Sequence, residues 1–259
     1  MLELTTIASG SSGNAVLVHD EDVNLLIDAG ISAKRICDGL KQLGKAPADL
    51  TAILITHSHS DHISGLRVLL KRTEAHIYTT APTARAIEEQ VEGALGRVHI
   101  IHPQEEYDFG SLMVLPFSTP HDAPGSVGYT VSNGRRKCCV VTDLGFVTEE
   151  VRRSVMGCHL ALVEANHDVD WLRSGPYPYY LKQRILGDRG HLSNEASGEL
   201  CCELVKSGAT KLILAHLSAE NNSPERAHHV VQAMLRRSGL DHVSLTVAPR
   251  CVCADPVEV

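Results

Sequence analysis

The segment His57–His62 has the greatest capacity for chemistry in this sequence. It reads HSHSDH and follows the apolar run AILIT, so three imidazoles and a carboxylate stand directly after a predicted strand. Imidazole nitrogens and carboxylate oxygens are the usual protein ligands of transition metals. A solvated polar loop explains a single HxH but explains this pattern poorly. The segment therefore predicts a metal site.

Further ionisable residues stand where short aliphatic runs end. The runs VNLLI, TAILIT, LMVLPFSTP, CCVVT, HLALV and KLILA are followed by Asp28, His57, His121, Asp143, Glu164 and His216. In open α/β sheets, ligands bind outside the carboxyl ends of the strands. We therefore expect the six residues to share one site along a sheet edge.

The elements that must position these residues are read from periodicity. Aliphatic runs alternate with amphipathic segments and no low-complexity linker interrupts them, which predicts a single α/β domain over residues 1–259. Ser32, Ser193 and Ser223 are predicted to begin helices, the last with Pro224 at its first position. Asn133–Gly134 predicts a hairpin turn, so the sheet arrangement should be mixed.

Composition narrows the class of protein. The chain is 43% hydrophobic and carries a formal net charge of −7, which disfavours a protein that coats nucleic acid but allows a local phosphate site. No apolar stretch is long enough to span a membrane, and no secretory signal is apparent, so we expect no membrane partner and a cytoplasmic location. The eight cysteines form no CxxC pair and are expected to be reduced.

Several strings together resemble a known family. SGSSGN, LLIDAGIS, ILITHSHSDHISGL, TPHDAPGSVGY, TDLG, LVEANHD, GHLSN and AHLSAENNSP are similar to the metallo-β-lactamase-fold hydrolases, and more finely to their WalJ (YycJ) branch. The resemblance implies an αββα sandwich with mixed sheets and a metal-dependent nuclease. It further implies 5′ to 3′ exonuclease action on double-stranded DNA, with DNA mismatch repair as a setting and as a source of protein partners.

The resemblance also implies a ligand set for two divalent metal ions. His57, His59 and His121 would bind one ion, and Asp61, His62 and His216 would bind the second. Asp143 would bridge the two ions. Asp28 would hold the HSHSDH loop, although a simple turn cap before Gly30 is the alternative. Zinc, manganese and iron all suit such mixed ligands, so the identity of the metal stays open.

Charge at this centre favours an anionic substrate. Two divalent cations bring four positive charges; Asp61 and Asp143 remove two, and a bridging hydroxide removes a third. A phosphodiester fits the remaining charge, and paired metals can activate water and stabilise the leaving oxygen. DNA or another nucleic acid is therefore the expected substrate. Neutral esters could use the same hydroxide, which leaves a thioesterase or lactonase as an alternative.

Glu164 and His191 are expected to act with Asp61 as catalytic residues. They resemble the Glu of the HEAT motif and the His of the HST motif in tRNA 3′ processing nucleases, a pair that protonates the leaving alkoxide. A tRNA 3′ processing-type endonuclease is therefore a further alternative, although the long flexible arm of those enzymes is not apparent. His191 could instead merely cap the helix that follows.

Six further residues are candidate substrate contacts. Exposed N–H groups and hydroxyls in the loop after the first strand suit an anion, and the segment YPYYLKQR, residues 177–184, combines aromatics with cations as expected where bases stack. A plain turn and an amphipathic helix face are the respective alternatives. The candidates are Ser11, Ser12, Asn14, His167, Tyr180 and Lys182.

Overall fold

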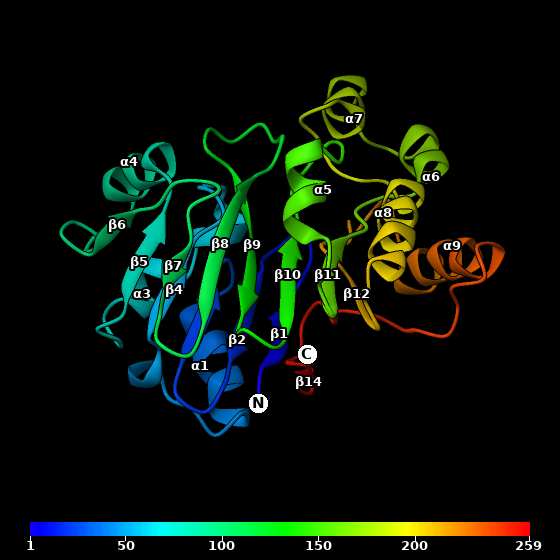
Figure 1. The fold of residues 1–259 in the computed structure, drawn as a ribbon. Helices are drawn as coiled ribbons and strands as arrows, with labels where there is room; N and C mark the ends of the chain where they lie inside the picture. Colours follow the sequence, from blue (N-terminus) through cyan, green and yellow to red (C-terminus); the bar gives the residue numbers. More distant parts are fainter.

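Two seven-stranded mixed sheets lie face to face at the centre of the computed structural model, which describes residues 1–259 (Figure 1). The first sheet has the order β14-β1-β2-β3-β4-β5-β6. Its strands are β1 (Glu3–Ala8), β2 (Ala15–His19), β3 (Asn24–Ile27), β4 (Ala52–Leu54), β5 (His76–Thr79), β6 (Val98–Ile100) and β14 (Val257–Glu258). Strands β3 to β6 run parallel, whereas β14, β1, β2 and β3 pair antiparallel.

The second sheet has the order β13-β12-β11-β10-β9-β8-β7. Its strands are β7 (Tyr107–Asp108), β8 (Met113–Ser118), β9 (Val127–Ser132), β10 (Lys137–Val141), β11 (Leu160–Glu164), β12 (Lys211–Ala215) and β13 (Ser244–Val247). Strands β10 to β13 run parallel, and β7 to β10 pair antiparallel. Asn133–Gly134 forms the predicted turn between β9 and β10, with Gly134 at φ 80°.

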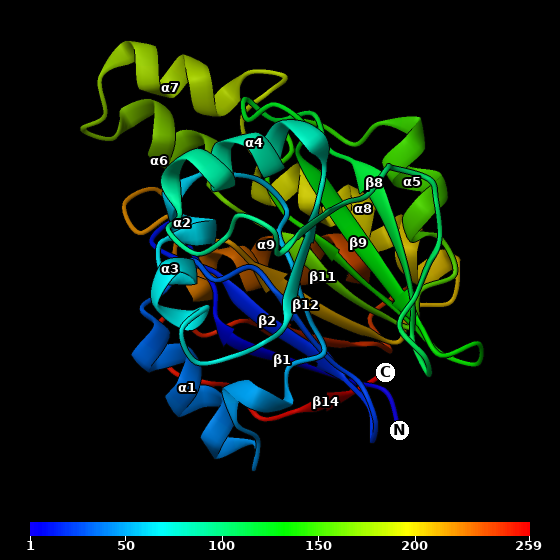
Figure 2. The same cartoon turned by 90° about the vertical axis from the view of Figure 1, so that its left-hand side faces the viewer.

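Helices cover the outer face of each sheet, which completes the αββα sandwich expected from the sequence (Figures 1 and 2). The helices are α1 (Ala33–Gln42), α2 (Ser60–Ile63), α3 (Leu66–Leu69), α4 (Ala81–Gln90), α5 (Glu149–Val155), α6 (Val169–Ser174), α7 (Tyr179–Leu186), α8 (Asn194–Lys206) and α9 (Pro224–Arg237), with a 3₁₀ turn at Pro47–Asp49. The apolar side chains of α1, α3 and α4 pack on the first sheet, and those of α5, α8 and α9 pack on the second. No helix is long and apolar enough to cross a membrane.

Side chains point alternately to the two faces of each strand, which explains why each sheet packs against the other sheet on one face and against helices on the other. Leu25 and Ile27 of β3 point into the layer between the sheets, whereas Leu26 between them points outward to α1 and its neighbours. In β10, Cys138 faces the inner layer and Cys139 the outer helices in the same way. Since successive side chains of a strand point to opposite faces, strands that are apolar at every position bury both faces of their sheet.

The predicted helix starts are confirmed. Ser32, Ser193 and Ser223 are the N-caps of α1, α8 and α9, and each side chain accepts a backbone N–H three residues later. These hydrogen bonds satisfy donors that a helix leaves free in its first turn. All eight cysteines are free, as expected.

The strand ends meet between the two sheets. Asp28 and His57 follow β3 and β4 of the first sheet, whereas His121, Asp143, Glu164 and His216 belong to β8, β10, β11 and β12 of the second or follow them. The expectation of a site along the edge of one sheet was therefore wrong in detail, because both sheets contribute. Helix α7 projects at this end of the sandwich, and both chain termini lie at the other end (Figures 1 and 2).

Candidate metal centre and active site

Three site residues have unusual backbone conformations. Asp28, Asp143 and His216 have φ values of 63°, 60° and 56°, in the left-handed region that side-chain-bearing residues rarely adopt. Each lies one or two residues beyond its strand, where this conformation turns the chain sharply. Such strain costs about 1 to 3 kcal/mol per residue and concentrates at functional sites.

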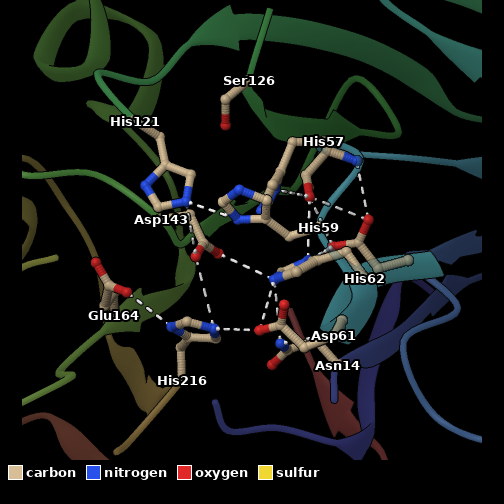
Figure 3. Close-up of polar contacts among 12 residues, drawn as sticks. Asn14, His57, His59, Asp61, His62, His121, Ser126, Asp143, Glu164 and His216 are labelled. Carbon is tan, nitrogen blue, oxygen red and sulfur yellow. Dashed lines mark hydrogen bonds and ion pairs between the residues drawn. The ribbon is translucent and has the colours of Figure 1, made fainter. Parts of the chain in front are cut away.

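Two groups of three potential ligands face one another across Asp143 (Figure 3). One comprises His57, His59 and His121; the other comprises Asp61, His62 and His216. One oxygen of Asp143, Oδ1, lies 3.7 Å from His121 Nε2 and 3.6 Å from His216 Nε2. Its other oxygen, Oδ2, lies 3.3 Å from His62 Nε2. Asp143 therefore stands between the two groups, and HSHSDH contributes to both.

Four of these imidazoles are held by one nitrogen while the other faces the centre. His62 donates from Nδ1 to Asp28 over 2.7 Å, and His216 donates from Nδ1 to Glu164 over 2.8 Å. His57 Nδ1 lies 3.0 Å from the hydroxyl of Thr56, and His121 Nδ1 lies 3.2 Å from the carbonyl of Gly190. Metal-bound imidazoles commonly use their second nitrogen in this way, which sets the tautomer and the ring orientation.

Several of the atoms that face the centre lack a suitable protein partner. His57 Nε2 and Asp143 Oδ2 are buried and have no hydrogen-bond partner. His59 Nδ1 and His121 Nε2 lie 3.3 Å apart, a separation at which two lone pairs repel unless something lies between them. A buried polar atom without a partner is costly, so these atoms fit divalent cations. The two groups of ligands together with Asp143 could hold two divalent cations.

Electrostatics at the centre supports cation binding. Burial would raise the pKa of Asp143, but the charges of His216 and His62 hold that pKa well below its usual range. Burial would likewise lower the pKa of His216, but the carboxylates of Asp143, Asp61 and Glu164 raise it to about 10. The carboxylates thus stay ionised and demand positive charge, which protons or metal ions can supply.

Close backbone packing holds the HSHSDH turn against the loop after β3. A Cβ at Gly30 would lie 1.6 Å from the carbonyl oxygen of Asp61, so only glycine fits there. Asn14 also holds the turn in place. Its backbone N–H donates to the Asp61 carbonyl over 2.9 Å, and its Nδ2 lies 3.2 Å from His62 Nε2.

Glu164 and His191 lie beside the second group of potential ligands. Glu164 is fully buried, and its Oε1 lies 2.8 Å from His191 Nδ1. Burial would raise the pKa of Glu164, but the charges and hydrogen bonds of His191 and His216 lower it to about 2. His191 keeps its Nε2 free and retains 18% side-chain exposure. The N-cap of α8 is Ser193, so His191 does not cap that helix.

The six candidate substrate contacts lie in different surroundings. Ser11 is exposed and lines a cavity that His191 also lines, and Ser12 is exposed beside it. Asn14 is buried against the candidate metal ligands, and His167 is 1% exposed, so neither presents a free surface to a large substrate. Tyr180 is 75% exposed on α7. The Lys182 ammonium donates to the carbonyls of Arg173 and Gly175 at the end of α6.

Two residues at the site were missed in the sequence. The Thr56 hydroxyl lies 2.9 Å from Asp28 Oδ2 and 3.0 Å from His57 Nδ1, so it links the two side chains. Asp122 places Oδ1 3.4 Å from His59 Nε2, and its other oxygen accepts from Arg184 of α7. Each is a direct sequence neighbour of a predicted ligand, and this position was the sequence feature that could have identified it.

An αββα sandwich with a His/Asp centre at one end of its two sheets defines the metallo-β-lactamase-fold hydrolases. The chain belongs to the Metallo-beta-lactamase superfamily, whose family model matches residues 8–216. It is 39% identical to the exodeoxyribonuclease WalJ of Streptococcus pneumoniae, over 90% of this chain and 88% of that protein. It is 35% identical to the exodeoxyribonuclease YycJ of Bacillus anthracis, over 92% and 90% respectively.

Solved structures show the same fold. The metallo-β-lactamase-fold protein YhfI of Bacillus subtilis superimposes with a TM-score of 0.75 at 14% identity, covering 98% of this chain and all of that one. The sequence-based prediction of the family and of the αββα fold is therefore confirmed.

Proposed function

We propose that this protein is a metal-dependent DNA exonuclease that hydrolyses phosphodiesters at a centre of two divalent ions. The ions would be held by His57, His59 and His121 and by Asp61, His62 and His216, with Asp143 between them. When bound, they would supply an activated water and neutralise the charge of the phosphate. The two exodeoxyribonucleases that match most of the chain support DNA as the substrate.

The observation that carries the proposal is the place of His191. Its Nδ1 donates to the buried carboxylate of Glu164, and Nε2 has no protein partner, so in the imidazolium form Nε2 carries a second proton that it can give away. A water oxygen forms a new bond to phosphorus and releases a proton to the solvent, the bond to the leaving oxygen breaks, and His191 Nε2 gives its proton to that oxygen. A deoxyribose alkoxide needs this proton far more than a thiolate does, so the pair favours phosphodiesters over thioesters.

Asp61 is proposed to act on the attacking water. Burial would raise its pKa, but hydrogen bonds from His216 and His62 hold that pKa far below its usual range, so the carboxylate stays ionised. Its Oδ2 lies 3.4 Å from His216 Nε2 and 3.5 Å from His62 Nε2. In this position it can bind a cation and accept a hydrogen bond from the attacking water.

The test uses duplex DNA labelled at either its 5′ or its 3′ end, with manganese or zinc added after chelator treatment. We expect release of the label from the 5′ end first, and no reaction in chelator. Asp143→Asn, purified identically, controls for contaminating nucleases and should be inactive. Turnover of thioesters or lactones by a protein inert toward DNA and RNA would contradict the proposal, and cleavage of RNA alone would transfer it to an RNA-processing enzyme.

The number of metal ions has its own test. Elemental analysis of reconstituted wild-type protein should give two transition-metal ions per chain. Saturation at one ion would contradict the dinuclear centre. The protein could then still be a metallohydrolase with a single ion.

A further inference from the structure

A cavity of about 250 Å³ opens beside His191 and is built from two chemically different walls. One wall is polar and comes from loops that follow β1, β11 and β12, with Ser11, Asn166 and Ser218. The other comes from the segment that contains α7, with Tyr177, Leu181, Arg184 and Ile185. Apolar and aromatic surface thus faces hydroxyl and amide groups across the cavity, a combination suited to a ligand with an apolar face and polar edges.

Helix α7 has two faces, and only one of them belongs to this cavity. Leu181, Arg184 and Ile185 follow helical spacing on the face toward His191. Tyr179, Lys182, Gln183 and Leu186 instead line a separate cavity of about 390 Å³ with Arg173 of α6. The two cavities share no residue, so the structure distinguishes an inner face of α7 (Leu181, Arg184, Ile185) from an outer face (Tyr179, Lys182, Gln183, Leu186).

The segment that contains α7 is positively charged, although the protein as a whole is acidic. Residues 171–190 contain four basic residues and one acidic residue, for a net charge of +3, whereas the whole chain has −7. No residue of α7 is buried. Arg184 donates from Nε to Asp122, whose other oxygen lies 3.3 Å from His121 Nε2. Asp122 therefore holds the guanidinium of Arg184 close to the metal ligands, where an anionic substrate would meet it.

We propose that this cavity binds the single nucleotide that carries the leaving oxygen, with Tyr177 against its base and Arg184 toward its phosphate. The proposal rests on the proposed function, because the group that His191 protonates must lie on the His191 side of the scissile phosphate. A volume of about 250 Å³ lies just below the usual range for small-molecule pockets, so it suits one nucleotide and not a longer strand. Cleavage one residue from an end, with mononucleotide products, follows.

Matched variants on the two sides of the segment test the proposal. Tyr177→Ala and Arg184→Gln alter the cavity beside His191, whereas Tyr179→Ala and Arg173→Gln make the same changes in the cavity that the outer face lines with Arg173. We expect KM for duplex DNA to rise about 10-fold or more in Tyr177→Ala, the usual worth of base stacking, with a smaller effect on kcat. Tyr177→Phe keeps the ring and should restore KM, and the outer-face pair should stay within about 2-fold of wild type.

Direct binding provides a readout without turnover. Calorimetric titration of chelator-treated protein with thymidine 5′-monophosphate should show binding that Tyr177→Ala and Arg184→Gln weaken and that the outer-face variants retain. Elemental analysis of each variant separates loss of this subsite from loss of metal. If wild-type protein cleaves DNA but the inner and outer variants behave alike, the subsite is wrong. If wild-type protein cleaves no nucleic acid, the proposed function itself fails.

Discussion

His191 and His216 share one oxygen atom, because both place Nδ1 2.8 Å from Oε1 of Glu164. The other oxygen of this buried carboxylate accepts the backbone N–H groups of Leu144 and Leu192 at 3.3 and 2.9 Å. The resemblance to tRNA 3′ processing nucleases paired Glu164 with His191 alone. The structure adds His216, so one carboxylate orients both the proposed proton donor and a potential metal ligand.

Replacing Glu164 by Gln should therefore impair two functions at once. An amide cannot accept from both imidazoles with the strength of a carboxylate, so His216 should hold its metal less tightly and His191 should lose its orientation. We expect metal affinity to fall about 10- to 100-fold, as for other groups that orient metal-bound histidines. Elemental analysis and turnover at saturating metal measure the two effects separately. Unchanged metal affinity would show that His216 does not depend on Glu164.

Replacing His191 by Ala should affect the chemical step alone. Turnover of DNA should fall about 10² to 10⁴-fold, the usual worth of general acid catalysis, while metal content stays at the wild-type value. The loss should be much smaller for a p-nitrophenyl phosphodiester, because nitrophenolate leaves without a proton. Loss of metal from this variant would show that His191 is a metal ligand or supports one. An equal loss of turnover on both substrates, with metal retained, would show that His191 binds phosphate.

Thr56 should matter for metal binding although it touches no metal. Its hydroxyl lies between Asp28 and the imidazole of His57, and valine has the same shape without the hydroxyl. Thr56→Val should weaken metal binding about 10-fold or more, whereas Thr56→Ser should stay near wild type. Competition with a coloured chelator measures the affinity. Indistinguishable affinities for the Val and Ser variants would contradict the link between Asp28 and His57.

His167 should make the protein less stable as the pH falls. Burial lowers its pKa to about 4, whereas an unfolded histidine titrates near its ordinary value of 6.5. The folded state therefore keeps His167 neutral, and acid protonates the unfolded chain first. Its contribution to the free energy of unfolding is present above pH 6.5 and is lost as the pH falls toward 4.

The size of this effect can be measured by difference. Between pH 7 and pH 5 the loss from His167 should be about 2 kcal/mol. Urea unfolding of wild-type protein and of His167→Gln at both pH values isolates this contribution, because all other groups titrate in both proteins. Parallel losses of stability in the two proteins would show that His167 is not responsible.

The local features of this fold were readable in the sequence. Helix starts at Ser32, Ser193 and Ser223 depend on hydrogen bonds to backbone groups three residues away. The strands were recognised because apolar runs bury both faces of a sheet. Asp28, His57, Asp143 and His216 could be placed at strand ends for the same reason, since the end of an apolar run marks where a buried strand ends.

Only the tertiary structure decided which side chains meet. The shared contact of Glu164 joins β11 to two loops distant in sequence, and the link from Thr56 to Asp28 spans two strands. Composition identified residues 177–184 as a basic aromatic segment, but it could not tell that Arg184 faces the centre while Lys182 faces α6. Helical spacing determines which residues share a face, whereas packing against the rest of the molecule determines where that face points.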